Sequence, residues 1–313
     1  MRKIFGIGET VFDILFRDEQ PVSATPGGST FNSMVSLGRC GVPAVFLSEV
    51  GDDRVGEMTL GFLERNGVDA GGVHVCPGMK STLSLAFLDA RNDARYTFYK
   101  DRPHDCPAFD PPEAGEGDLV LFGSFYAVNP ELRSRVGGFL EYARSRGAVL
   151  YYDVNFRPSH EKDREAVLPN FFRNIELADF VRGSREDFLT LFGMEDCEEV
   201  FREKISGRCP RFLFTRGADP VTVLDAAGFR KSYPVRQTET VSTIGAGDNF
   251  NAGFLFGLLK EGITRRTLVQ GLSEAQWDSL VDCAGRFSSE CCRNLYNYVS
   301  PAFAAEMRLF PAL

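Results

Sequence analysis

The 313-residue sequence has a single tryptophan, three histidines and no excess of basic residues. Its 35 Lys and Arg residues are outnumbered by 43 Asp and Glu residues, which gives a net charge of −8 at pH 7. Nucleic acids and anionic membrane surfaces bind to basic faces, so this charge argues against both as partners. A phosphate ligand is still compatible with it, because one loop can bind phosphate locally. No apolar run reaches the 18 residues of a membrane span.

The cysteine and histidine pattern lacks the spacing of a structural zinc site. No C-x-x-C pair occurs, and the three histidines are scattered at positions 74, 104 and 160. The eight cysteines belong to a long chain whose first residues reach Gly, Glu and Asp too early for a secretory signal. We therefore expect reduced thiols and a cytoplasmic protein.

Two common nucleotide-binding motifs are also missing. No G-x-x-x-x-G-K-[ST] sequence occurs, which argues against a P-loop protein. Gly6 and Gly8 begin like a dinucleotide-binding fingerprint, but Val11 occupies the position of its last glycine. A Rossmann dehydrogenase is therefore disfavoured.

The composition is that of an ordinary globular protein, and short apolar runs alternate with amphipathic segments. This alternation predicts β-α units on a mostly parallel sheet flanked by helices, an α/β fold in a single domain over residues 1–313. The expected strands are 3–7, 44–48, 119–122, 149–152, 180–182, 212–215 and 221–224. The expected helices are 31–38, 57–66, 130–146, 185–192, 198–205, 264–272 and 274–294, with another beginning near residue 247.

The region around residues 81–100 departs from this alternation. Two β-like runs at 81–89 and 95–100 are joined by a turn-rich segment, which predicts a hairpin. With the extended segment 11–16, it predicts a small β-sheet lid formed by about 11–24 and 73–102. The alternative is a set of extra edge strands on the main sheet. Because the hairpin has two apolar faces, we expect a homodimer that pairs the lids.

The strongest functional signal is the stretch Thr-Ile-Gly-Ala-Gly-Asp-Asn-Phe at residues 243–250. Gly245, Ala246 and Gly247 have almost no side chain, so backbone N–H groups can converge on one point beside a helix N-terminus. This predicts an anion hole for a phosphoryl group. Asp248 would repel a bound phosphate, but it could take a proton from an attacking hydroxyl beside it. The alternative is that Asp248 only caps the helix.

A second polar cluster precedes the first predicted helix. Gly27 and Gly28 expose their backbone there, and Asn32 faces the same end, where its amide could bind a polyol. Asp13 follows the first strand and could accept hydrogen bonds from sugar hydroxyls. These residues form a candidate substrate site.

A third cluster consists of Asp153, Asn155 and Arg157, at alternate positions just past a predicted strand. Ligands bind at this edge of a parallel sheet, and the three side chains suit a polar or charged substrate. A salt bridge at the strand end is the alternative.

Together the three clusters resemble the ribokinase/phosphofructokinase-B type of carbohydrate kinase. Residues 27–56 resemble its N-terminal signature and residues 243–250 its highly specific C-terminal signature, within a resemblance that runs from residue 6 to about 251. The resemblance implies an α/β domain with a β lid, ATP and Mg²⁺ as cofactors, and phosphorylation of a hydroxymethyl group. It implies that Asp248 is the catalytic base at an anion hole formed by Gly245–Gly247. It implies sugar contacts at Asp13, Gly27, Gly28 and Asn32.

The resemblance further implies a set of residues that line the nucleotide site: Ser184, Thr215, Gly217, Gly245 and Gly247. Ser184 and Asp187 stand where many members carry Asn and Glu, a pair linked to magnesium and phosphate. Asp187 is therefore the expected metal residue, acting through water. Ser242 replaces an Asp that many members have near a monovalent cation, so activation by potassium is doubtful.

The third cluster resembles the fructokinase and 2-keto-3-deoxygluconate kinase branch of the family. The sequence thus predicts an ATP-dependent kinase for a small ketose, with fructose first. The alternatives are a sugar-acid kinase such as a 2-keto-3-deoxygluconate kinase, a ribokinase or nucleoside kinase, and a non-catalytic sugar or nucleotide sensor. Three arginines in or beside the lid leave a phosphorylated sugar open as a substrate: Arg91, Arg95 and Arg102.

Overall fold

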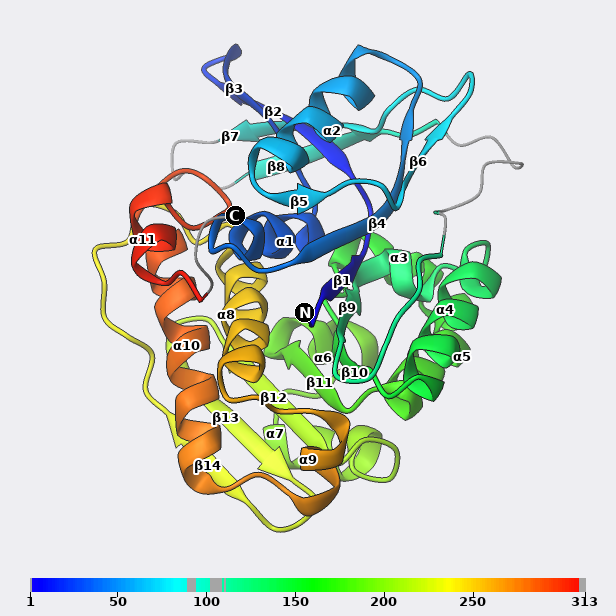
Figure 1. Cartoon of the computed structure of the whole chain (residues 1–313). Coiled ribbons are helices and arrows are strands. Elements are labelled where there is room, and N and C mark those ends of the chain that lie inside the picture. The colour runs from blue at the N-terminus through cyan, green and yellow to red at the C-terminus, as the bar shows by residue number, and fades with distance from the viewer. Residues whose placement is uncertain (1, 89–93, 102–108, 110, 310–313) are drawn as a thin grey trace.

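The computed structural model describes residues 2–88, 94–101, 109 and 111–309. In this part of the chain a ten-stranded sheet lies between helices, and a separate four-stranded sheet stands over one end (Figure 1). The predicted α/β class with a mostly parallel sheet is confirmed. The separate pairing of the small sheet also excludes the alternative of extra edge strands.

The main sheet has the strand order β14-β13-β12-β11-β10-β9-β1-β4-β5, with β6 paired to β4. The strands are β1 Ile4–Ile7, β4 Ala44–Gly51, β5 Val68–Asp69, β6 Val73–Cys76, β9 Leu119–Gly123, β10 Val149–Asp153, β11 Phe180–Ser184, β12 Arg211–Arg216, β13 Asp219–Asp225 and β14 Arg230–Tyr233. All pairs are parallel except those of β13 and β14 at one edge. Strands β1, β9 and β10 are buried throughout, as expected for parallel strands covered on both faces.

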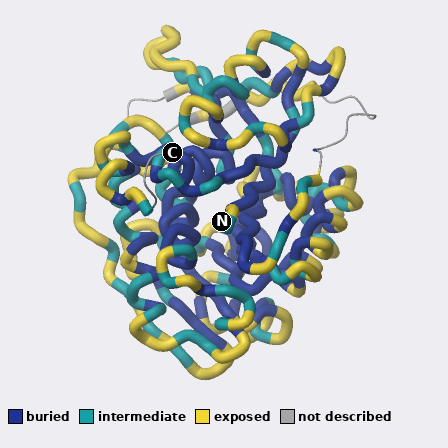
Figure 2. The backbone as a smooth tube through the Cα atoms, in the orientation of Figure 1, coloured by how far each residue is buried: buried dark blue, intermediate teal, exposed yellow. Residues whose placement is uncertain are grey.

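Helices cover both faces of this sheet. They are α1 Ser29–Arg39, α2 Arg54–Arg65, α3 Ser124–Val128, α4 Arg133–Ser145, α5 Arg164–Leu177, α6 Arg185–Phe192, α7 Cys197–Val200, α8 Ala246–Lys260, α9 Arg265–Gln270, α10 Glu274–Cys292 and α11 Pro301–Glu306. A 3₁₀ segment at Pro158–Asp163 and a π-helical segment at Phe201–Ile205 complete the helical elements of the described chain. One apolar core packs α1, α8 and α10 against the sheet, and the other packs α4, α5 and α6. Figure 2 shows the buried backbone concentrated in the sheet and these inner helices.

The small sheet forms the lid, with strands β2 Val11–Arg17, β3 Gln20–Gly27, β7 Leu83–Leu88 and β8 Ala94–Tyr99 in the order β3-β2-β7-β8. The predicted hairpin is present as the antiparallel pair β7 and β8. The predicted lid boundary at residue 73 was wrong, because Val73–Cys76 pairs with β4 of the main sheet. A short apolar run does not reveal which sheet it will join. Arg91 and Arg102 lie outside the described residues.

The sequence led to one prediction about membrane spans and one about the cysteine thiols. Among the described residues, no helix combines the length and apolarity that crossing a membrane requires. The expectation that all eight thiols are reduced was wrong for Cys76, which is disulfide-bonded at the end of β6. Spacing along a sequence does not reveal which thiols meet in space.

Candidate active site

The small residues at 245–247 form the N-terminus of α8. Gly245 is the N-cap in the left-handed conformation, with φ 79° and ψ −2°, and no side chain caps the helix. A Cβ on Gly245 would lie 3.0 Å from backbone atoms of Asn297, so the turn has no room for a side chain there. The first N–H groups of α8 are thus left without a capping side chain, which is the arrangement of an anion site.

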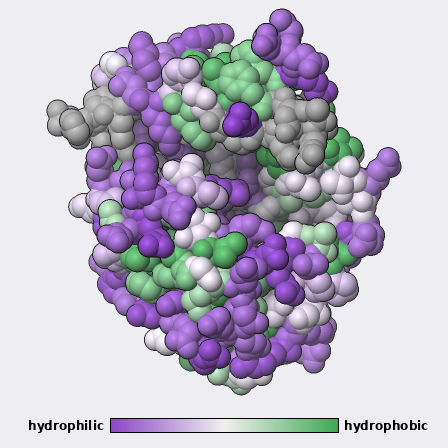
Figure 3. All heavy atoms as spheres, turned by 180° about the vertical axis from the view of Figure 1, so that it is seen from behind, coloured by the Kyte–Doolittle hydropathy of each residue, from purple (hydrophilic) through white to green (hydrophobic). Residues whose placement is uncertain are grey.

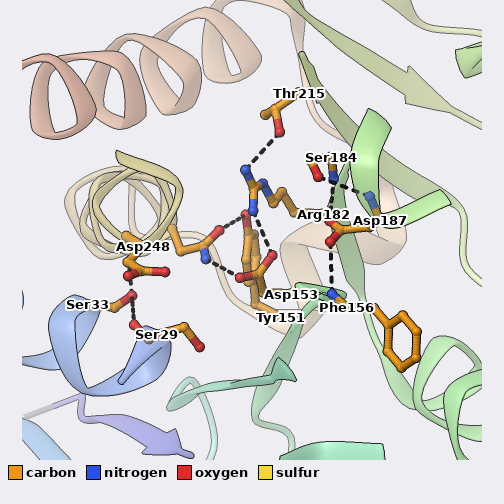
Figure 4. A network of polar contacts seen from close by, with 11 residues as sticks. Ser29, Ser33, Tyr151, Asp153, Phe156, Arg182, Ser184, Asp187, Thr215 and Asp248 are labelled. Atoms are coloured by element: carbon orange, nitrogen blue, oxygen red, sulfur yellow. Dashed lines mark hydrogen bonds and ion pairs between the residues drawn. The ribbon is translucent and has the colours of Figure 1, made fainter. Parts of the chain in front are cut away.

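Asp248 is the third residue of α8 and is only 9% exposed. Its Oδ2 accepts a hydrogen bond of 2.8 Å from Nδ2 of Asn32, and its backbone carbonyl accepts one of 2.7 Å from Ser33. Figure 4 shows Asp248 facing α1 across this contact with Ser33. Because the N-cap is Gly245 and no side chain caps α8, the alternative of Asp248 as a helix cap finds no support.

Burial determines the charge state of Asp248. It raises the pKa of the carboxyl to about 6, against the opposing hydrogen bond from Asn32. The positive charge of Arg157 also lowers this pKa, which places its guanidinium within electrostatic range of Asp248. A carboxylate with a pKa near neutrality is suited to exchange protons at physiological pH.

The second cluster comes together around Gly27, at the end of β3. A Cβ on Gly27 would lie 2.7 Å from Oδ2 of Asp13 and 3.7 Å from Oδ1 of Asn32. Oδ1 of Asn32 is buried and has no hydrogen-bond partner in the described chain. Gly28 has φ 128°, and a Cβ there would overlap the carbonyl oxygen of Glu9. Two side-chain oxygens therefore converge where glycine leaves space, an arrangement that suits hydroxyl groups.

The small sheet contributes to this cluster through Asp13 of β2. Asp13 on β2, Ser84 on β7 and Phe98 on β8 are register partners, so the three side chains share one face of the lid sheet. Burial raises the pKa of Asp13 to about 6. Lys100, just past β8, forms an ion pair of 3.1 Å with Glu9, which joins the lid to the end of β1. Seen from behind, the surface is hollowed between the lid and the main body (Figure 3).

In the third cluster, Asp153 lies in a buried ion pair, whereas Arg157 lies on the surface. Asp153 is buried, and its two oxygens accept hydrogen bonds of 2.9 Å from Arg182 and from Asn251 (Figure 4). The alternative of a strand-end salt bridge is therefore correct for Asp153, with Arg182 as the partner instead of Arg157. A direct substrate contact by Asp153 finds no support in this geometry.

Arg157 lies on the surface, whereas Asn155 is buried. Arg157 is exposed and forms no ion pair with the described residues. Asn155 is buried with φ 36°, and Ser124, at the end of the neighbouring strand β9, has φ 51°. Non-glycine residues rarely adopt this conformation, and such strain gathers at functional sites. Sequence reasoning missed Ser124, because no sequence pattern revealed its backbone conformation.

The expected nucleotide residues lie at the ends of β11 and β12. Thr215 is buried and accepts a hydrogen bond of 2.7 Å from Arg182, and Gly217 follows in an exposed turn with φ 60°. Ser184 and Asp187 form a capping box at the start of α6. Asp187 is buried, and it accepts hydrogen bonds of 2.8 Å and 2.6 Å from the backbone N–H groups of Phe156 and Ser184. The role of Asp187 toward magnesium stays a prediction.

A magnesium ion could reach this site only together with a nucleotide. No group of three or more His, Cys, Asp or Glu side chains in the described chain could hold a metal by itself. Mg²⁺ in phosphoryl-transfer sites is bound by one or two carboxylates together with substrate phosphates and water, so a protein cage is not required.

An uncapped helix N-terminus beside a buried carboxylate of raised pKa is the arrangement expected of a phosphotransferase that acts on an alcohol group. The family model for pfkB family carbohydrate kinases matches residues 1–277. The chain therefore belongs to the pfkB family of carbohydrate kinases.

Sugar kinases of other organisms resemble most of the chain. A fructokinase of Rhizobium leguminosarum bv. trifolii is 28% identical over 279 residues, which cover 85% of this chain and 83% of that protein. A 5-dehydro-2-deoxygluconokinase of Geobacillus kaustophilus is 26% identical and covers 80% of this chain and 77% of its own length. The crystal structure of a fructokinase from Vibrio cholerae, with fructose, ADP and calcium bound, superposes with a TM-score of 0.82 at 21% identity. It covers 98% of this chain and 99% of that one.

Proposed function

We propose that this protein transfers the γ-phosphoryl group of ATP to a hydroxymethyl group of a small ketose, most simply fructose. The observation that carries the proposal is the contact between Asp248 and Asn32. It joins the acid beside the anion site to the pocket that contains Asp13 and Gly27. The resemblance to fructokinases supports fructose as the first candidate.

The site residues suggest how the reaction proceeds. Asp13 and Asn32 accept hydrogen bonds from sugar hydroxyls, and Asp248 accepts the proton of the attacking hydroxyl. The new bond forms between that oxygen and the γ-phosphorus while the bond to the β-phosphate oxygen breaks, and ADP leaves. The N–H groups of residues 245–247 stabilise the charge on the transferred group. Magnesium, when bound with the nucleotide, neutralises part of the phosphate charge.

A sugar acid is the second candidate substrate. Arg157 is an exposed cation without an ion-pair partner in the described chain, and it lies within electrostatic range of Asp248. A guanidinium suits a carboxylate as well as a keto group. The resemblance to 5-dehydro-2-deoxygluconokinases favours the same class.

A panel of acceptors with ATP and Mg²⁺ tests the proposal by measuring ADP release. It contains fructose, ribose, 2-keto-3-deoxygluconate, 5-dehydro-2-deoxygluconate and a nucleoside. We expect the highest kcat/KM for fructose. A higher value for either sugar acid would replace fructose by that class. Ligand binding without ADP release from any acceptor would indicate a sensor and contradict the proposal.

Three further proposals concern the localisation, the oligomeric state and the effect of potassium. We propose that the enzyme works in the cytoplasm, where ATP is supplied, as a homodimer paired through its lids. We also propose that potassium does not activate it, because Ser242 replaces the Asp that many family members have near a monovalent cation. Comparing ADP release in sodium and potassium salts checks the last point.

A further inference from the structure

Arg182 is a buried arginine directly beneath the anion-binding turn. A Cβ on Gly247 would lie 3.0, 3.2 and 3.4 Å from Nη2, Nη1 and Cζ of Arg182. Because Nη2 and Nη1 are nearer than Cζ, the edge of the guanidinium that carries these two nitrogens faces Gly247. A side chain at position 247 would therefore crowd the guanidinium in this position.

The same side chain is part of a hydrogen-bonded network that reaches α8. Nη1 of Arg182 forms an ion pair of 2.9 Å with Asp153, and Nη2 donates to Thr215. Asp153 in turn accepts from Asn251, whose Oδ1 accepts from the hydroxyl of Tyr151 at 3.0 Å. Figure 4 shows this network running between the strand ends and α8. The start of α8 is thus attached to three neighbouring strands, β10, β11 and β12.

A purely structural ion pair does not account well for this placement. Apolar residues of similar volume often replace a buried ion pair without loss of stability. Nε of Arg182 is buried without a hydrogen-bond partner in the described chain, as is Nε of Arg211 on β12. The guanidinium approaches the turn at Gly247, and Asp153 accepts a hydrogen bond from Asn251, four residues further along α8.

We propose that Arg182 is a positioning residue for phosphoryl transfer. Its guanidinium holds the turn at residues 245–247 on the sheet and places a fixed positive charge behind the γ-phosphoryl group. Water is largely excluded at this depth, so a fixed guanidinium acts there with little screening, although the ion pair with Asp153 offsets part of its charge. The inference rests on the proposed function, because it assigns a γ-phosphoryl group to this turn.

Nucleotide binding separates this role from simple stabilisation. ADP lacks the γ-phosphate that the non-hydrolysable analogue AMP-PNP carries, so calorimetry with both nucleotides and Mg²⁺ isolates the contribution of that group. The test variant is Arg182→Met with Asp153→Asn, which removes both charges of the pair, while the nearby buried Asp187 keeps its two backbone hydrogen bonds. We expect AMP-PNP affinity to fall about fivefold or more relative to ADP, and kcat to fall about tenfold or more with the sugar KM unchanged.

A matched control exists at the opposite end of β12. Arg211 and Asp225 form another buried pair, with 3.3 Å between Nε and Oδ2. Arg211→Met with Asp225→Asn should change the melting temperature and leave the ratio of the two nucleotide affinities unchanged. Arg182→Lys keeps the charge but cannot bind Asp153 and Thr215 at once as the guanidinium does, so it should restore only part of that ratio. If the methionine variant does not fold, Arg182→Gln with Asp153→Asn serves the same purpose.

The proposal would be overturned if the Arg182 variant bound ADP and AMP-PNP more weakly by the same factor. It would also be overturned if the ratio of the two affinities were the same in the Arg182 variant and the Arg211 control. The failure of the proposed function would look different. Wild-type protein would then bind AMP-PNP but phosphorylate no acceptor in the panel, and the nucleotide comparison would still test Arg182.

Discussion

Two carboxylates in the candidate site, Asp13 and Asp248, have pKa values near 6 because of burial. Asp248 must be ionised to accept a proton, so kcat/KM for the sugar should be constant above pH 7. Below about pH 6 it should fall tenfold per pH unit, or more steeply if Asp13 must also be ionised. Initial rates between pH 5 and 9 check this. An acidic limb near pH 4 would contradict the assignment.

The raised pKa values of Asp13 and Asp248 also make stability depend on pH. As the pH rises, their contribution to stability falls, whereas the expected activity increases. The folded protein binds more protons than the unfolded chain between about pH 4 and pH 6, so this contribution to stability falls as the pH rises through that window. For Asp248 the loss above pH 6 corresponds to about 3 kcal/mol at most. Asp248→Asn should therefore melt at or above the wild-type temperature at pH 8, and a clearly lower value would indicate a structural role.

Arg157 offers a second test among single residues. If it contacts the sugar, Arg157→Ala should raise the sugar KM about tenfold or more, since a lost charged hydrogen bond costs roughly 1.5–3 kcal/mol. The KM for ATP should remain nearly unchanged. Steady-state kinetics with each substrate varied in turn provide the measurement. Arg146→Ala, at the exposed C-cap of α4, is the control, and equal rises in both KM values would argue against a sugar contact.

Between elements, the close approach of α8 and α10 depends on one glycine. A Cβ on Gly253 of α8 would overlap the backbone carbonyl of Cys283 in α10. Gly253→Ala should therefore lower the free energy of unfolding by about 1–3 kcal/mol, although alanine favours a helix. Gly138→Ala on α4 is the matched control, since nothing lies within 4 Å of its Cβ position. It should raise stability by roughly 0.5–1 kcal/mol. Urea denaturation measures both, and a stabilised Gly253 variant would show that the helices can separate.

The predicted elements agree with the structure where periodicity and length were clear. The predicted helix at 185–192 has the bounds of α6, and the seven predicted strands all exist. Helix α5 was missed because Pro169 lies within it, and an internal proline usually signals a helix end. Strand β3 was missed because its exposed polar residues lack an apolar alternation.

The candidate site was predictable where its residues are neighbours in sequence. The turn at 245–247 and Asp248 form one contiguous motif, and the fold brings Asn32 to it. Arg182 was not predictable, because its contacts come from β10, β12 and α8. A charged residue inside the buried strand Phe180–Ser184 was the one available signal. The ion pair between Asp153 and Arg182 was missed because the two residues lie on different strands.

At the scale of the whole molecule, the lid leaves apolar surface exposed. Phe87 is 41% exposed and stacks on Phe16 with 5.0 Å between ring centroids. Apolar residues gather over this part of the molecule when it is seen from behind (Figure 3). Such a surface on a sheet with free edges favours pairing with a second copy.

We expect wild-type protein to be a dimer at micromolar concentration in light scattering, and Phe87→Glu to shift it toward the monomer. Tyr142→Glu, a similarly exposed aromatic on α4, should leave the mass unchanged. A monomeric wild type would contradict lid pairing. A dimer that persists in Phe87→Glu would place the interface elsewhere.

Asp248 joins the N-terminus of α8 to Asn32 and Ser33 of α1, so the kcat of Asp248→Asn tests the central claim most directly. The variant keeps the size of the side chain and loses the base. We predict that it binds ATP and sugar with near-normal affinity and turns over at least about a hundredfold more slowly, since removing a general base costs 10²–10⁴-fold. A near-normal kcat in this variant would contradict the account.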